Sequence, residues 1–360
     1  MRIPNVIPLA PNRVWRTYLG GRTLDALEGR ENPADTHFPE DWIGSTTRAN
    51  NKGREHLRDE GLSRVSIYGQ EHLLTDLFER NPAEILGTEH YRDYGSQTGF
   101  LVKFLDSAIR LHIQCHPTIA FAQEHLNSNA GKTEAYVILK TREEVKDPYI
   151  YMGFQNPPDI KEFRTAILEQ RVDQILGCFE KIPVNAGDVF LVPGGFPHAI
   201  GEGVFMIEIM EPTDLVVRIE FERGGYVLPE EARFMGRDVD FALSMFDFSR
   251  TTVDDVHDRF FSRLRMVNQF NPDSSEASLI DERMTDCFSV RRLAVKGAIE
   301  KNEAGFYIAI VTEGSGAVES GDGEPRSLRF GDRFLVTGKA DNTRYSSKIG
   351  MQLILALPPK

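Results

Sequence analysis

Short apolar runs separated by turn residues dominate the chain. Eight of these runs have the length and the β-branched or aromatic content of strands, and they span residues 99–105, 110–116, 134–140, 187–193, 203–210, 214–221, 306–312 and 351–358. Fewer segments carry apolar residues at helical spacing, namely 118–127, 160–179 and 237–246. This pattern predicts a mainly β protein with a few short helices, of the barrel or sandwich type rather than alternating βα units.

One short motif occurs twice. "GDVFLVPGG" at 187–195 returns as "GDRFLVTGK" at 331–339, each time between strand-like runs. A Gly-Asp turn before an apolar strand is common, so chance repetition stays an alternative. With the surrounding strand spacing, the repeat favours two related β-barrels. We therefore expect an N-terminal domain over 1–240, a helical or irregular connection over 241–275 and a C-terminal, degenerate barrel over 276–360.

Length and charge narrow the classes of protein to consider. A chain of 360 residues suits two domains. Its formal charge of −12 argues against nucleic acid or an anionic membrane as a main partner, because the overall field repels both. No apolar run reaches about 18 residues, so neither a signal peptide nor a membrane span is expected. A monomer and a homodimer both stay open.

The cysteines indicate the compartment. Cys115, Cys178 and Cys287 are far apart and form no CxxC pair, so neither a disulfide framework nor a thiolate zinc site is predicted. We expect a reducing, cytoplasmic environment.

Metal-capable side chains alternate in the stretch "LHIQCHP". On a strand, Gln114 and His116 share one face, and His112 lies behind them. In "GKTEAYVIL" a further strand places Lys132 and Glu134 on one face. Each stretch alone is also compatible with a solvated strand edge, so neither decides for a metal site by itself.

A third stretch is more specific. "GDVFLVPGGFPHAI" spaces Gly187, Pro193, Gly195 and His198 in a way that is similar to the second motif of the cupins, small β-barrels in which this His faces a metal. Cupins carry their first motif as alternating ligands and a later carboxylate, and the residues of the two earlier stretches take those places. Two imidazoles, a carboxylate and an amide suit zinc, while manganese, cobalt and ferrous iron stay open by ligand type.

Taken in order, these stretches resemble the type I mannose-6-phosphate isomerases. "LVKFLDSAIRLHIQCHP", "GKTEAYVIL" and "PGGFPHAIGEGVFMIEIMEPTDLVVRIEF" carry the resemblance. It implies one Zn²⁺ held by Gln114, His116, Glu134 and His198, in the first barrel only, since the second copy of the repeat lacks the Pro and His. It also implies interconversion of mannose 6-phosphate and fructose 6-phosphate through a cis-enediol.

The resemblance extends to charged pocket residues. Glu208, Asp214 and Arg218 share the inward parity of the ligands on the predicted strands, although a charged residue on a strand is more often solvated. Asp214, Glu208 and Lys132 are candidates for the catalytic base. Arg218 and Lys103 are expected to hold phosphate or developing negative charge.

One position departs from the family. His112 stands where relatives often have a small hydroxyl residue, so we expect it to contact substrate and to influence which sugar fits. The alternatives are therefore an isomerase of another sugar or sugar phosphate, an iron-dependent cupin oxygenase and a non-catalytic sugar-binding cupin.

Overall fold

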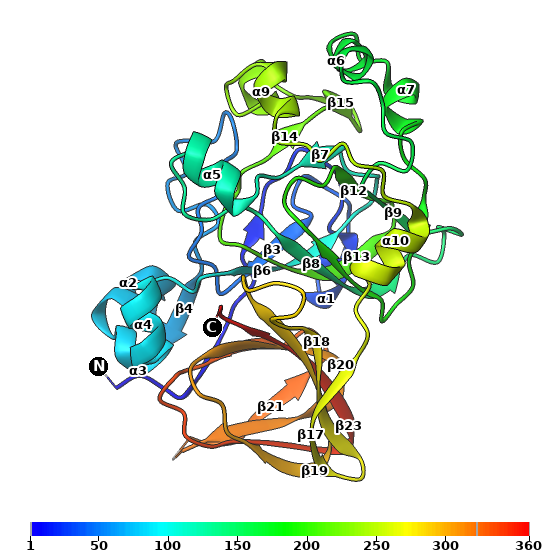
Figure 1. Cartoon of the computed structure of the whole chain (residues 1–360). Helices are drawn as coiled ribbons and strands as arrows, with labels where there is room; N and C mark the ends of the chain where they lie inside the picture. Colours follow the sequence, from blue (N-terminus) through cyan, green and yellow to red (C-terminus); the bar gives the residue numbers. More distant parts are fainter. Residues whose placement is uncertain (1, 322, 360) are drawn as a thin grey trace.

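Three antiparallel sheets form most of the protein, as the strand-rich sequence predicts (Figure 1). The computed structural model describes residues 2–321 and 323–359. Two sheets face each other in the upper part of the view, and the third forms the lower part. No helix in the described residues is both long and apolar enough to cross a membrane.

A six-stranded sheet lies at the centre. Its order is β11-β8-β13-β6-β3-β2, with β2 at Arg13–Val14, β3 at Glu40–Ile43, β6 at Leu101–Asp106, β8 at Glu134–Thr141, β11 at Val189–Val192 and β13 at Val204–Met210. Four of these strands were predicted as apolar runs. Strands β6, β11 and β13 are buried along their whole length, which explains why those runs are nearly continuous in apolar residues.

A five-stranded sheet faces it, in the order β10-β9-β12-β7-β14. Its strands are β7 at Gln114–Cys115, β9 at Tyr149–Met152, β10 at Ile182–Pro183, β12 at His198–Ile200 and β14 at Val217–Arg218. Here the predicted strands 110–116 and 214–221 were too long. Side chains replace part of the ladder, because the Glu220 carboxylate accepts a hydrogen bond from the Ile113 amide and Arg110 donates to the Leu111 carbonyl.

The third sheet has eight strands. The members are β1 (Val6–Pro8), β17 (Arg265–Asn271), β18 (Ser274–Ile280), β19 (Ser289–Lys301), β20 (Tyr307–Ser320), β21 (Arg326–Arg329), β22 (Arg333–Val336) and β23 (Thr343–Leu357). Strand β1 pairs with β22, so the start of the chain belongs to the sheet formed by its end.

Closed barrels, which the sequence led us to expect, are not formed by the hydrogen bonds of the described residues. Each sheet is open, because its order does not return to the first strand, and in the eight-stranded sheet β21 branches off by pairing with β20. The long strands β19, β20 and β23 bend instead at bulges, for example between Val295 and Gly297. The mainly β prediction is confirmed, in the form of open sheets that curve and face one another.

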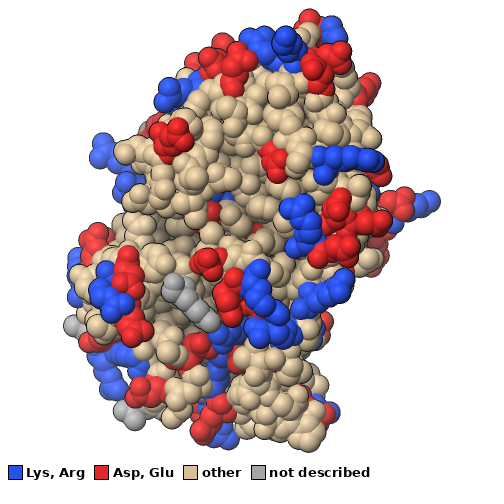
Figure 2. Space-filling view, viewed as in Figure 1, with Lys and Arg blue, Asp and Glu red and all other residues tan. Residues whose placement is uncertain are grey.

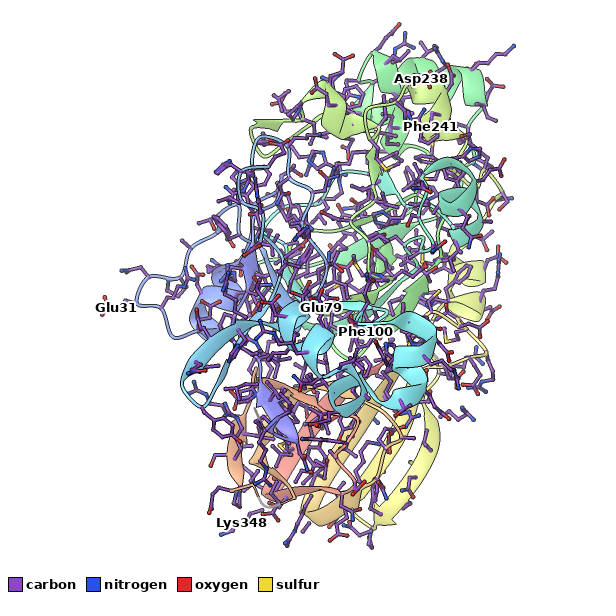
Figure 3. All side chains as sticks on the ribbon, turned by 90° about the vertical axis from the view of Figure 1, so that its left-hand side faces the viewer. Glu31, Glu79, Phe100, Asp238, Phe241 and Lys348 are labelled. Atoms are coloured by element: carbon purple, nitrogen blue, oxygen red, sulfur yellow. The ribbon has the colours of Figure 1, made fainter. Side chains whose placement is uncertain are left out.

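Helices and two small hairpins connect the sheets. They are α1 (Arg22–Leu27), α2 (Leu74–Arg80), α3 (Pro82–Leu86), α4 (Thr88–Tyr94), α5 (Ile119–His125), α6 (Ile160–Leu168), α7 (Val172–Leu176), α8 (Glu230–Arg233), α9 (Val239–Leu243) and α10 (Val253–Arg259), with hairpins β4 (Arg64–Ile67)–β5 (Gln70–Leu73) and β15 (Glu222–Arg223)–β16 (Tyr226–Val227). The helix predicted over 160–179 is two helices, interrupted where Gln170 has a positive φ of 52°. Figure 3 shows α2, with Glu79 labelled, near Phe100 where the upper and lower parts meet.

The repeated Gly-Asp motif has the same local structure in both copies. Gly187 and Gly331 have positive φ angles of 95° and 86°. The carboxylate that follows accepts a hydrogen bond from the amide three residues earlier, at 2.7 Å for Asp188 and 2.9 Å for Asp332. A four-residue buried strand then begins in each copy. The two copies therefore share the turn and its hydrogen bond as well as the amino-acid sequence.

One apolar cluster joins the central and the eight-stranded sheets. It includes Ile43 and Phe104 from the former and Ile308 and Leu335 from the latter. Beside it lies a buried ion pair between Arg333 on β22 and Asp41 on β3, with side-chain exposures of 7% and 1%. Burial raises the pKa of Asp41, while Arg333 opposes that rise.

We predict that Arg333→Met destabilises the protein by about 3–5 kcal/mol, since it leaves the Asp41 charge buried without its partner. Urea unfolding at neutral pH measures this change. Arg344→Met is the matched control, because Arg344 pairs with Glu319 at the surface and its loss should cost less than about 1 kcal/mol. Equal losses in the two variants would contradict the assignment of the buried pair as a junction between the sheets.

Candidate active site

The five-stranded sheet aligns three of the predicted site residues. Gln114 on β7 lies directly opposite His198 on β12 and, on its other side, opposite Arg218 on β14. Residues opposite each other on neighbouring strands share a face, so all three present their side chains to the central sheet. His116 follows β7 at the same parity as Gln114, while Cys115 points into an apolar cluster on the other side.

The central sheet contributes a second row. Glu208 on β13 lies between Tyr136 on β8 and Lys103 on β6. Glu134 precedes Tyr136 by two residues on β8, and the Tyr136 hydroxyl donates to its carboxylate at 2.8 Å. The facing surfaces of the two sheets therefore enclose the residues that the sequence had placed on separate strands.

His116, Glu134 and His198 form a candidate metal centre. Their ligand atoms all lie within 4.8 Å of one another, and all three residues are buried. Nε2 of His116 is 3.1 Å from Oε1 of Glu134, and Nε2 of His198 is 3.5 Å from Oε2.

Backbone carbonyls fix both imidazoles. Nδ1 of His116 donates to the Leu215 carbonyl and Nδ1 of His198 to the Phe196 carbonyl, each at 2.8 Å. Burial, followed by the charge of Lys132, lowers the pKa of His116 to about 3, so its Nε2 carries a lone pair at neutral pH. Neither this nitrogen nor Glu134 Oε1 has a hydrogen-bond partner among the described residues. Of the two acceptors, Glu134 Oε1 has the Lys132 amine at 3.3 Å, whereas His116 Nε2 has no donor or cation beside it in the described residues, and a divalent metal would satisfy it.

Gln114 completes the predicted ligand set. Its side-chain amide nitrogen is placed 3.3 Å from Nε2 of His198. Amide nitrogen and oxygen are interchangeable by a half-turn of the group, and a half-turn would direct the carbonyl oxygen to the same point. The donor set of two imidazoles, a carboxylate and an amide oxygen is therefore consistent with the predicted site.

A cavity with about 440 Å³ of empty space adjoins these ligands. Every other site residue predicted from the sequence lines it: Lys103, His112, Lys132, Glu208, Asp214 and Arg218. It meets a wider outer cavity of about 1250 Å³, and Asp214, Val216 and Arg218 line both. Figure 2 shows acidic and basic side chains interspersed over the face seen in Figure 1.

Among the lining residues that the sequence reasoning missed, three interact with one another through charged or hydroxyl groups. Arg16, Tyr18 and Glu40 form a buried group in which Arg16 donates to Glu40 at 2.8 Å and the Tyr18 hydroxyl donates at 2.6 Å. Arg16 and Tyr18 lie in the "RTYLGG" stretch, more than sixty residues from the next ligand-bearing strand. Only the pairing of β3 with β6 brings Glu40 to the cavity, and no local pattern could indicate that pairing.

Asp214 lies in the cavity for a different reason than the predicted strand parity. It precedes β14, and Arg16 holds it with two hydrogen bonds of 3.0 Å, one to each carboxylate oxygen. Burial opposes its charge, but Arg16 and then Lys132 outweigh burial and lower the pKa of Asp214. A carboxylate so stabilised is a weak base.

Lys103 is also paired already. Its Nζ lies 2.8 Å from Glu208 and 3.3 Å from Glu40. Burial disfavours the ammonium, but Glu208 and Glu40 overcome that effect and raise the pKa of Lys103. Burial and the nearby charge of Glu134 raise the pKa of Glu208 to about 8. Glu208 therefore exchanges protons near neutral pH, whereas Lys103 stays charged.

The positive charges of Lys132 and Arg218 have fewer carboxylate partners than that of Lys103. Burial lowers the pKa of Lys132, whose Nζ is 3.3 Å from Glu134. Burial lowers the pKa of Arg218 to about 10, and no carboxylate in residues 2–321 and 323–359 lies within ion-pair distance of it. Its one hydrogen bond among the described residues, at 3.4 Å, goes to the Ala232 carbonyl. A half-buried guanidinium that lines a cavity and has no carboxylate partner favours an anionic ligand.

His112 lines the cavity wall. Its Nδ1 donates to the Glu220 carbonyl at 2.9 Å, and burial lowers its pKa to about 3, with Arg218 as the next cause. Its Nε2 is buried without a partner in the described part of the chain. This nitrogen is therefore an acceptor that a substrate hydroxyl can satisfy.

Comparisons with known proteins agree with this geometry. No family model matches the chain. The mannose-6-phosphate isomerase of Streptococcus mutans is 33% identical over 147 residues, which is 39% of this chain and 44% of that protein. The chain thus spans less than half the length of that relative. Mannose-6-phosphate isomerase ManA of Bacillus subtilis is 26% identical over 243 residues, covering 65% of this chain and 69% of ManA.

Solved structures extend the likeness to the fold. The mannose 6-phosphate isomerase of Bacillus subtilis superimposes with a TM-score of 0.73 at 21% identity, over 98% of this chain and 99% of that one. A putative mannosephosphate isomerase from Archaeoglobus fulgidus gives 0.74 at 18% identity over the whole of both chains. This chain is thus similar in sequence to mannose-6-phosphate isomerases, and its fold is similar to the fold of the two solved structures.

Proposed function

We propose that this protein is a metal-dependent isomerase that interconverts mannose 6-phosphate and fructose 6-phosphate through a cis-enediol. The observation that carries the proposal is the buried Nε2 of His116, which has no hydrogen-bond partner in the described residues and faces Glu134, together with Arg218, which has no carboxylate partner there. A cation and an anion satisfy these groups together. The relatives named as mannose-6-phosphate isomerases supply the substrate, a sugar phosphate.

Gln114, His116, Glu134 and His198 are the proposed ligands, and zinc is the proposed metal. When bound, the metal supplies Lewis acidity that favours negative charge on the sugar oxygens. The residues of the eight-stranded sheet carry no comparable group in the described chain, which supports a single site in the first half. The repeated turn supports two cupin-like halves, with boundaries near 240 and 276.

Proton transfer between C1 and C2 is assigned to Lys132 and Glu208. Burial shifts the pKa of each toward neutrality, downward for the amine and upward to about 8 for the carboxyl. A carboxyl with a pKa of about 8 can give and accept protons near neutral pH, and the lowered pKa of Lys132 makes its amine easier to deprotonate. Asp214, which the sequence offered as a base, is better suited to holding Arg16 in place.

Arg218 is assigned to the phosphate or to the enediolate. It lines both cavities, so an anion at the junction reaches it from the outer side while the sugar carbons occupy the inner cavity. Lys103, the other predicted phosphate ligand, contacts Glu208 and Glu40 and supports their positions instead. His112 accepts a hydrogen bond from a sugar hydroxyl through its free Nε2.

The direct test is an isomerase assay of the purified protein on mannose 6-phosphate. We expect turnover in the metal-replete protein, loss of turnover after chelation and recovery on adding zinc. Free mannose is the comparison substrate and should react at least about tenfold more slowly, since it lacks the charge that Arg218 binds. No turnover of either sugar by the metal-replete protein would refute the proposed function.

Arg218→Gln should lower kcat/KM for mannose 6-phosphate roughly 100-fold, because it removes a preorganised positive charge from the cavity. The same change should affect free mannose much less if Arg218 binds the phosphate, and equally if it binds the enediolate. Arg164→Gln is the control, since Arg164 forms an exposed pair with Asp240 and lines neither cavity. Steady-state kinetics on both sugars measure the difference. Unchanged kinetics in Arg218→Gln would contradict the assignment.

A further inference from the structure

The buried carboxylate of Glu211 binds the backbone on both sides of Lys132. Glu211, which directly follows β13, accepts hydrogen bonds from the Gly131 amide at 2.9 Å and the Thr133 amide at 2.8 Å, one on each carboxylate oxygen. Its own amide donates to the Thr133 carbonyl at 3.1 Å. Glu211 is 4% exposed and is not part of the cavity lining. It thus fixes the main chain on both sides of Lys132 without facing the substrate space.

The same loop is held from its other side. The Lys132 amide donates to the Pro117 carbonyl at 2.9 Å, and the Thr213 hydroxyl donates to the Gly131 carbonyl at 2.6 Å. Gly131 packs so closely that a Cβ atom there would lie 2.6 Å from the Pro117 carbonyl oxygen. Hydrogen bonds therefore hold the backbone of residues 131–133 from both sides. The two bonds to the Glu211 carboxylate are the strongest of them, because their acceptor is charged.

The C-terminal half covers this carboxylate. Cys287 lies in the connection between β18 and β19, beside Glu211. Burial and the Glu211 charge together raise the pKa of its thiol to about 11. Cys287 thus shields Glu211 from water. This cysteine belongs to the C-terminal half, where the described residues form no candidate metal centre.

We infer that Glu211 is a positioning residue for Lys132: it holds the Gly131–Thr133 backbone so that the Lys132 amine stays beside Glu134 and the cavity. The inference rests on the proposed isomerase function. Lys132 has a long, flexible side chain, so its amine is placed only as well as its backbone is placed. A displacement of about 1 Å at a reacting group can cost roughly 100-fold in rate.

The test is a double-mutant cycle on kcat. Glu211→Gln keeps the size of the side chain but replaces one acceptor oxygen by an amide group that cannot accept from an N–H. We expect kcat to fall roughly 10- to 100-fold with little change in KM. In a Lys132→Ala background the same substitution should change kcat less than about twofold, because the group it positions is gone.

Asp106→Asn is the matched control. Asp106 is also a buried carboxylate that holds two backbone amides, those of Gly21 and Thr23, at 3.1 and 2.8 Å. It should lower the melting temperature as Glu211→Gln does but leave kcat within about twofold of the wild type. Bound metal per chain is measured in every variant, and the inference requires it to be unchanged in Glu211→Gln.

Three results would overturn the inference. In the first, Glu211→Gln lowers kcat by the same factor in the Lys132→Ala background as in the wild type. In the second, Glu211→Gln loses its metal, and in the third, Glu211→Gln keeps the wild-type kcat. An inactive wild-type protein would instead remove the proposed function. In that case, or if Lys132→Ala has no measurable turnover, amide hydrogen exchange decides. Faster exchange confined to residues 131–134 in Glu211→Gln supports the positioning role, and unchanged exchange there contradicts it.

Discussion

The site depends on acceptors that face one another in a buried space. His116 Nε2 and Glu134 Oε1 are 3.1 Å apart, and no proton is available to lie between them, because the imidazole proton is committed to the Leu215 carbonyl. Such an arrangement is unfavourable unless a cation neutralises it. The backbone carbonyls that accept from the two histidines therefore determine the chemistry as much as the ligands do, because they fix which nitrogen carries the lone pair.

The cationic side chains around this centre differ in how closely carboxylates pair with them. Four of them line the inner cavity. Arg16 and Lys103 are tied to carboxylates, whereas Lys132 keeps one close contact with Glu134 and Arg218 has no carboxylate partner in the described residues. The paired cations stabilise the framework, and the less compensated ones are available to a ligand. The same residue types thus take different roles because burial and partners differ.

Sequence reasoning located the ligand residues because strand alternation and the Pro-to-His spacing are local properties. It was less successful where side chains replaced backbone pairing, as at Ile113, whose amide bonds Glu220 instead of a neighbouring strand. It missed Glu40 because only the pairing of β3 with β6 brings this residue to the cavity, and it missed Arg16, which donates a hydrogen bond to Glu40. It placed Asp214 in the cavity by assuming strand alternation over 214–221, but β14 contains only Val217 and Arg218 and does not include Asp214. Long-range pairing, rather than composition, was the information that a single sequence lacked.

The pairing of β1 with β22 has a consequence for synthesis. Val6 is synthesised well before its partner Val336. At roughly 5–20 residues per second, the chain between them takes on the order of half a minute to appear. During that time β1 has no native partner, although the strands of the six-stranded and five-stranded sheets are already available to pair. The eight-stranded sheet is thus completed late, and until then β1 is an unpaired strand that chaperones or another nascent copy can contact.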